Sequence, residues 1–239
     1  MSQAWHRRRP ELVKQTREDL RALYPTLHLF IEADGTAVVA GTFPVRDPTG
    51  RVLDRYQVSI TLPEDYPRSL PIVREVGGRI PWKPEFHVNA NGTACVLLPD
   101  DRWRCFPEGA PFVQFLDGPL HDFFLGQSLV ALGEKWPFGQ WSHGANGVYE
   151  YYQWLLGTDD AATITRYLRV LAKLNFKDHL ECPCGSGRKI RRCCRAKVLD
   201  LRQKIPPRVA RKALETLAAR TQPVRRISPC PPGETPSVK

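Results

Sequence analysis

Four cysteines lie within thirteen residues of one another, and this cluster restricts the fold of its part of the chain more than any other feature. They are Cys182, Cys184, Cys193 and Cys194. A tetrahedral zinc site can be formed by two thiols that are separated by one residue and followed, after eight further residues, by two adjacent thiols. Gly185 and Gly187 permit the sharp backbone turn that this closure needs. The sequence therefore predicts a small module built around a structural zinc ion, with no coordination position left open for chemistry.

Length and charge divide the chain unevenly. Its 239 residues suffice for one domain of ordinary size and a smaller module. The net charge is +10, and residues 180–239 account for it with 15 Lys and Arg against 4 Asp and Glu. These basic residues can contact nucleic acid or an acidic protein, or can simply be solvated. No aromatic residues are interleaved with the arginines to stack on bases, which weakens the nucleic-acid interpretation.

The chain shows no membrane or export signal. It has no run of eighteen apolar residues, and no apolar stretch follows the arginines near its N-terminus. We therefore expect a cytoplasmic protein without a membrane span. In a reducing cytoplasm, clustered cysteines favour metal binding over disulfides. The three remaining cysteines are Cys95, Cys105 and Cys230, and the sequence assigns no role to the last two.

Local patterns predict one helix followed by four antiparallel strands. An amphipathic pattern with a proline in its first turn indicates a helix over residues 10–23. Alternating or short apolar runs and turn signals such as Asp34-Gly35 indicate the strands. We expect these strands at residues 27–31, 37–43, 56–62 and 72–76. The predicted class is α+β.

Further helices are expected after the strands. A strongly apolar segment at residues 112–132 predicts a large helix interrupted near Gly118-Pro119. Helical spacing recurs at residues 148–156, 159–176, 197–204 and 207–221. The expected organisation is a larger domain at 1–157, a helical linker at 158–178 and a zinc module at 179–204. Residues 205–239 are expected to form a basic helix followed by a Pro-rich disordered tail at 223–239.

A second stretch, from His87 to Cys95, carries a candidate nucleophile. The Asn91-Gly92 turn places Cys95 where its sulfur can be reached from outside, and a thiol acts as a nucleophile only as an accessible thiolate. The side-chain amide of Asn89 can stabilise the oxyanion that forms when an amine attacks a thioester. The alternative is an ordinary buried cysteine. Asp100 and Asp101 follow; they can help to deprotonate an attacking amine or can simply be solvated.

This stretch resembles the active-site segment of ubiquitin-conjugating enzymes, which reads His-Pro-Asn, Asn-Gly, the catalytic Cys and then Trp eight residues later. The spacing from Cys95 to Trp103 agrees, and residues 62–73 resemble the family's Pro-x-x-Tyr-Pro-x-x-x-Pro-x-Val segment. Val88 replaces the proline, and the loop is two residues shorter, as in bacterial members. The resemblance covers roughly residues 10–155 and implies the ubiquitin-conjugating (UBC) fold. It makes Cys95, Asn89 and His87 the site residues, with His87 packing and hydrogen-bonding within the loop and Trp103 in a core.

The cysteine cluster is similar to the SEC-C motif, Cys-Pro-Cys-Gly-Ser-Gly-x-x-Tyr-x-x-Cys followed by Cys or His, with Ile190 at the aromatic position. Bacterial conjugating-enzyme-like proteins of this kind are encoded in CBASS antiphage systems. There the resemblance implies a cGAS-like nucleotidyltransferase whose C-terminus is the acyl donor. The chain has no nucleotide-binding signature, so activation would need another protein or another route. A non-catalytic adaptor that only docks a partner remains the alternative.

Overall fold

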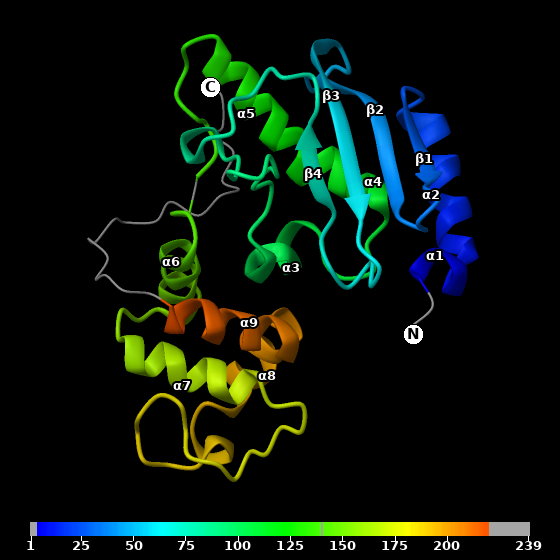
Figure 1. Cartoon of the computed structure of the whole chain (residues 1–239). Coiled ribbons are helices and arrows are strands. Elements are labelled where there is room, and N and C mark those ends of the chain that lie inside the picture. Colours follow the sequence, from blue (N-terminus) through cyan, green and yellow to red (C-terminus); the bar gives the residue numbers. More distant parts are fainter. Residues whose placement is uncertain (1–3, 140, 220–239) are drawn as a thin grey trace. The chain divides into compact units, whose positions relative to one another are not determined.

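The computed structural model describes residues 4–139 and 141–219 of the chain (Figure 1). The chain divides into two compact units. The first comprises Met1–Leu97 and Arg104–Phe138, and the second comprises Leu98–Trp103 and Gly139–Lys239. The first unit contains an antiparallel sheet with helices, so the predicted α+β class is confirmed at that level. The tail expected at residues 223–239, with Cys230, lies outside the described residues.

A four-stranded sheet forms the centre of the first unit. All neighbouring strands are antiparallel and follow the order of the sequence, β1-β2-β3-β4 (Figure 1). Gly35, with a left-handed φ of 86°, allows the tight turn between the first two strands, as the Asp-Gly signal predicts. The strands are β1 (Leu27–Ile31), β2 (Ala37–Arg46), β3 (Val52–Leu62) and β4 (Ile72–Glu75).

Helices cover one face of this sheet. The apolar segment predicted as an interrupted helix forms α4 (Phe112–Phe115), a π-helical turn (Leu116–Leu120) and α5 (His121–Ala131). The interruption contains Gly118 and Pro119, as expected, because proline removes a backbone donor and clashes with the preceding turn. Phe124 of α5 packs its ring 4.6 Å from that of Tyr56 and 5.5 Å from that of Phe43. These contacts join α5 to β2 and β3 in one core.

The N-terminal segment of the first unit contains a short helix that the sequence patterns do not predict. Helix α1 (Trp5–Arg8) precedes the expected α2 (Pro10–Leu23). Trp5 is 1% exposed, and its ring lies 5.1 Å from the ring of Tyr66. One buried aromatic residue gives no periodicity, so only the folded chain identifies this anchor.

The second unit is helical. Its core joins α6 (Ala145–Leu156), α7 (Ala161–Leu171), α8 (Arg195–Lys204) and α9 (Pro207–Ala218). This grouping differs from the expected boundaries at 157 and 178, because α6 and α7 contribute fully buried side chains such as Tyr152, Ile164 and Leu168 to the same core. The apolar stripe of α7 is buried against α9, so residues 158–178 belong to this core.

A short excursion of the chain also belongs to the second unit. Residues 98–103 contain the turn η2 (Pro99–Asp101) and the start of α3 (Arg102–Cys105). Trp103 donates a hydrogen bond to the hydroxyl of Tyr151 at 2.8 Å, and the ammonium of Lys204 lies 4.7 Å from its ring centre. Trp103 is therefore a packing residue, as expected, but its partners are helices of the second unit. Among the described helices, none is long and apolar enough to cross a membrane.

Candidate functional site

The stretch that carries Cys95 is a short hairpin in the first unit. Val88 and Ala94 form an antiparallel bridge, and the backbone N–H of Cys95 donates to the carbonyl of His87 at 2.7 Å. Gly92 closes the turn with a left-handed φ of 78°, and its N–H donates to the Asn89 carbonyl at 2.9 Å. The Asn-Gly signal therefore forms the tight turn that the sequence predicts.

His87 is buried and takes part in packing. Its backbone has a φ of 53°, which is uncommon for a residue other than glycine. Its ring lies 4.3 Å from the ring of Trp136, and it is 7% exposed. Just before it, the side-chain amide of Gln127 donates to the carbonyl of Phe86 at 2.6 Å. These contacts hold the base of the hairpin against the helical face of the first unit.

Cys95 and Asn89 lie close together on this hairpin. The Cys95 thiol is half-buried rather than fully accessible, and burial raises its pKa. A hydrogen bond with the exposed side chain of Asn89 opposes this shift, because it favours the thiolate. The Asn89 amide also donates to the hydroxyl of Thr93 at 3.0 Å, and that hydroxyl donates to the side-chain oxygen of Asn91 at 2.7 Å. Thr93, which the sequence does not single out, thus orients the amide that faces the thiol.

Asp100 and Asp101 lie in the second unit and are buried rather than solvated. Asp100 is 6% exposed and accepts a hydrogen bond from the hydroxyl of Tyr152 at 2.6 Å. Burial raises the pKa of Asp100 to about 6, and the hydrogen bond from Tyr152 opposes the shift. Asp101 is 3% exposed. Both carboxyl groups are therefore part of the packed second unit.

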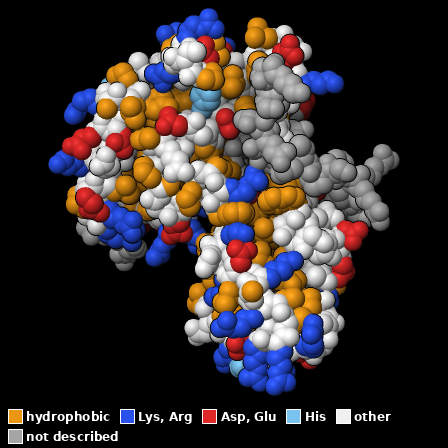
Figure 2. Space-filling view, turned by 180° about the vertical axis from the view of Figure 1, so that it is seen from behind, with side chains coloured by type: hydrophobic (Ala, Val, Ile, Leu, Met, Phe, Trp, Pro, Cys, Tyr) orange, Lys and Arg blue, Asp and Glu red, His pale blue; other side chains and the backbone are white. Residues whose placement is uncertain are grey.

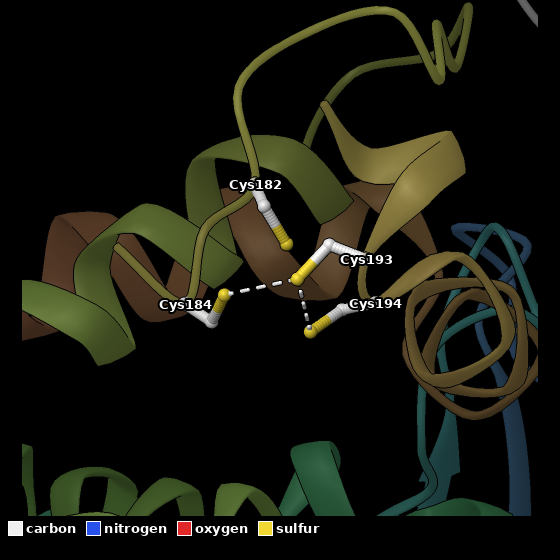
Figure 3. Close-up of side chains that lie close together, drawn as sticks. All are labelled: Cys182, Cys184, Cys193 and Cys194. Atoms are coloured by element: carbon white, nitrogen blue, oxygen red, sulfur yellow. Dashed lines mark hydrogen bonds between the residues drawn. The ribbon is translucent and has the colours of Figure 1, made fainter. Parts of the chain in front are cut away.

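The four predicted metal ligands meet in the second unit. The Sγ atoms of Cys182, Cys184, Cys193 and Cys194 all lie within 4.8 Å of one another, and Figure 3 shows them pointing toward a common centre. The sulfurs of Cys184 and Cys193 are 3.6 Å apart, and those of Cys193 and Cys194 are 3.8 Å apart. A tetrahedral zinc ion with four thiolates at 2.3 Å requires sulfurs about 3.8 Å apart. The cluster can therefore hold a metal ion of this size.

The backbone around the cluster folds as the two glycines suggest. Gly185 and Gly187 have left-handed φ values of 82° and 71°, which turn the chain sharply after Cys184. The N–H of Cys182 donates to the carbonyl of Arg188 at 2.8 Å, which closes the loop. Arg166 of α7 donates from its Nε to the carbonyl of Pro183 at 3.0 Å and so attaches the loop to the helical core.

Two further side chains support the sulfurs. The hydroxyl of Ser186 lies 3.3 Å from the sulfur of Cys193, and the guanidinium of Arg188 donates to the same sulfur at 3.3 Å. Hydrogen bonds with Ser186 lower the pKa of Cys184 to about 6 and also lower that of Cys193. Burial raises the pKa of Cys182 to about 12, so this thiol needs the metal charge to become a ligand.

The molecule thus presents two kinds of chemistry, each in one unit. The hairpin offers a half-buried thiol beside an amide, and the cysteine cluster offers four sulfur ligands without an open position. Comparison with family models, with curated proteins and with solved structures finds no match.

Proposed function

We propose that the first unit is a ubiquitin-conjugating-like domain in which Cys95 accepts an acyl group from a protein C-terminus as a thioester and passes it to an amine. The observation that carries the proposal is the hairpin that brings Asn89 and Cys95 close together: the N–H of Asn89 donates to the carbonyl of Thr93 at 2.9 Å, and the N–H of Cys95 donates to the carbonyl of His87 at 2.7 Å. The helix followed by a four-stranded antiparallel meander supports it, because that is the element order of the resembled fold.

Loading requires the thiolate of Cys95. The sulfur attacks the carbonyl carbon of an activated acyl donor, the bond from that carbon to its leaving group breaks, and the leaving group takes up the thiol proton. Burial of Cys95 and its raised pKa keep the free thiol protonated at neutral pH. A base supplied with the donor is therefore part of the loading step.

Transfer requires stabilisation of an oxyanion. An amine attacks the thioester carbon, the bond from that carbon to the sulfur breaks, and the surplus proton of the amine passes to the sulfur, which leaves as the thiol of Cys95. Negative charge develops on the carbonyl oxygen in between, and a preorganised amide donor is worth about 10²–10³ in rate at such a position. Asn89 is the donor that the hairpin offers, held by Thr93. His87, packed on Trp136, acts on the shape of the loop.

A peptide carrying a C-terminal thioester tests the loading step without an activating enzyme. Full-length protein incubated with this peptide should gain its acyl mass, and the adduct should be removed by excess thiol. Cys95→Ala should abolish the adduct, whereas the matched control Cys105→Ala should retain it. Cys95→Ser should give an oxyester that resists thiol. An undiminished adduct on Cys95→Ala would refute the assignment of Cys95.

Asn89→Ala separates the two steps. It should leave the loaded fraction nearly unchanged and slow the release by lysine by about 10²–10³. Thr93→Val should slow release less, because it removes only the support of the amide. If both variants release the acyl group as fast as the parent chain, the amide has no catalytic role.

For the second unit we propose that the four cysteines bind one structural zinc ion, as in the SEC-C motif. The support is the match between the sulfur separations of 3.6 and 3.8 Å and the tetrahedral requirement. A donor consistent with the resemblance is the C-terminus of a cGAS-like nucleotidyltransferase in antiphage defence. Failure of Cys95 to load, with zinc retained, would favour the alternative of an adaptor that only docks its partner.

A further inference from the structure

Six basic side chains surround the loop that the four cysteines close. All six are exposed, and we refer to them as the basic face: Lys177, Arg188, Lys189, Arg191, Arg192 and Arg195. Figure 2 shows Lys and Arg side chains gathered at the end of the second unit that carries this loop. We propose that the basic face binds the phosphate backbone of duplex nucleic acid.

Backbone pairing brings these side chains together. The N–H of Ile190 donates to the carbonyl of Leu180, and the N–H of Arg191 donates to the carbonyl of Asp178, both at 2.9 Å. Glu181 and Lys189 form an antiparallel bridge between the same two segments. Lys177 therefore lies beside the arginines of the second segment, although fourteen residues separate it from Arg191 in sequence. The cysteine cluster links the two segments, so the backbone positions that carry the cations are fixed relative to one another.

The positive charge of the basic face is mostly uncompensated. Between Lys177 and Lys197 the chain has seven Lys and Arg but only two acidic residues, Asp178 and Glu181. Asp178 pairs with Arg195 at 3.3 Å, and Arg188 donates to the sulfur of Cys193.

Four members of the face form no ion pair with any residue that the structure describes: Lys177, Lys189, Arg191 and Arg192. Four thiolates with one zinc ion would together carry −2, which lowers the local charge of residues 177–197 from +5 to +3. The four side chains have no ion-pair partner in the described part of the chain and can meet an external anion.

The composition of the surface favours nucleic acid over a protein partner. Protein interfaces depend on buried aromatic or aliphatic anchors. Within the described part of residues 177–219, no large hydrophobic side chain is exposed. A phosphodiester backbone needs only cations and hydrogen-bond donors, and arginine is well suited to phosphate. Single strands bind by stacking bases on aromatic rings, which this surface lacks, so a duplex with its higher charge density is the better ligand.

The four cations that form no ion pair with a described residue determine the expected strength of duplex binding and its dependence on salt. Neutralising about four phosphates gives a slope of about −3.6 for log affinity against log salt, which is about a hundredfold loss between 50 and 200 mM salt. The dissociation constant at physiological salt should lie at about 10⁻⁴–10⁻⁶ M, as for contacts without base readout. Affinity should not depend on base sequence, because contacts to phosphate carry no sequence information.

Fluorescence anisotropy with a labelled 20-base-pair duplex and the full-length, zinc-replete chain tests the proposal. The double variant Arg191→Glu/Arg192→Glu should weaken binding more than tenfold and reduce the salt slope by about two. The matched control is Arg17→Glu/Arg21→Glu on the exposed side of α2, which changes the net charge equally in the first unit and should bind like the parent. Metal content is measured for every variant, and Arg191→Gln/Arg192→Gln provides a milder change if the glutamates release zinc.

Three results would overturn the inference. The first is equal loss in the α2 control, which would indicate an effect of net charge alone. The second is an affinity that does not fall with salt. The third is tighter binding of a polyglutamate peptide of the same charge, which would indicate an acidic protein as partner. Cys95→Ala should bind the duplex normally, so failure of the acyl-transfer proposal and failure of this one are distinguishable.

Discussion

Replacing Asp100 by asparagine should stabilise the second unit at neutral pH. The carboxyl group is 6% exposed, and the hydroxyl of Tyr152 donates a hydrogen bond to it at 2.6 Å. Burial raises the pKa of Asp100 from 3.8 to about 6. Asparagine keeps an oxygen that can accept from Tyr152 but carries no charge, so it removes the cost of burying a carboxylate.

The sign and size of the effect follow from proton linkage. Because the folded-state pKa is the higher one, the contribution of Asp100 is fully present below pH 3.8 and is lost as the pH rises through about 6. The difference between 3.8 and about 6 corresponds to about 3 kcal/mol, at about 1.4 kcal/mol for each pH unit. The parent chain should therefore lose about 3 kcal/mol relative to Asp100→Asn between pH 3 and pH 8.

Hydrogen exchange followed by mass spectrometry can measure this difference locally. Peptides from α6 report the opening of the second unit, and peptides from β3 serve as an internal control in the first unit. Glu215→Gln is the matched variant, since it removes an exposed carboxylate from the same unit. Parallel pH profiles for the parent and Asp100→Asn in α6 would show that the buried carboxyl group imposes no such cost.

The remaining substitutions probe the zinc loop and the hairpin. Cys184→Ser should lower the zinc content, measured by elemental mass spectrometry, below one ion per chain and should increase amide exchange at residues 181–195. The reason is that zinc binding contributes about 10–16 kcal/mol to the folding of comparable small modules. A full zinc content in this variant would contradict the prediction. Gly92→Ala should destabilise the first unit by about 1–3 kcal/mol in urea unfolding, because φ is 78° and a Cβ would lie 2.8 Å from the indole of Trp82. Adding Trp82→Ala to the Gly92→Ala chain should restore the part of the unfolding free energy that the clash with the indole removes. If nothing is restored, the whole loss of stability is due to the left-handed φ of residue 92.

The sequence predicts the elements of the first unit well because each has a strong local signal. The amphipathic pattern with its proline gives α2 at its observed bounds, and the Asp34-Gly35 turn gives the first hairpin. The cysteine cluster is equally local, since a spacing of one and eight residues brings four thiols together without help from distant segments. The Asn91-Gly92 turn likewise predicts the Cys95 hairpin.

Tertiary packing decides what the sequence could not show. The pattern of α7 reveals an apolar stripe but not its partner, so the helix reads as a linker although Ile164 and Leu168 are fully buried. The sequence predicts Asp100 as a solvated loop residue, because nothing near it in sequence indicates burial. Its hydrogen-bond partner, Tyr152, lies fifty-two residues away in the chain. The exposed basic residues of the zinc loop are visible in sequence, but their alignment with Lys177 depends on the backbone pairing of two segments.

Removing the second unit should disturb the segment that follows Cys95. The chain leaves the first unit after Leu97 and returns at Arg104, and the intervening residues pack in the core of the second unit. Helix α9 packs against the turn Pro99–Asp101, and Trp103 is bonded to Tyr151. A zinc module appended to a complete domain would be dispensable. This topology instead leaves residues 98–103 without α6, α9 and Lys204, against which they pack, when the chain is cut at 138.

The expected cost can be measured in the truncated chain 1–138, which ends with the first unit. Loss of burial at Leu98 and Trp103 should cost about 2 kcal/mol, which corresponds to roughly thirtyfold faster amide exchange in residues 98–103. Strand β3, which has its partners within the first unit, should exchange as in the full chain and is the control. Unchanged protection of residues 98–103 would mean that these contacts contribute nothing. Faster exchange would mean instead that the segment after the Cys95 hairpin depends on packing within the zinc-bearing unit.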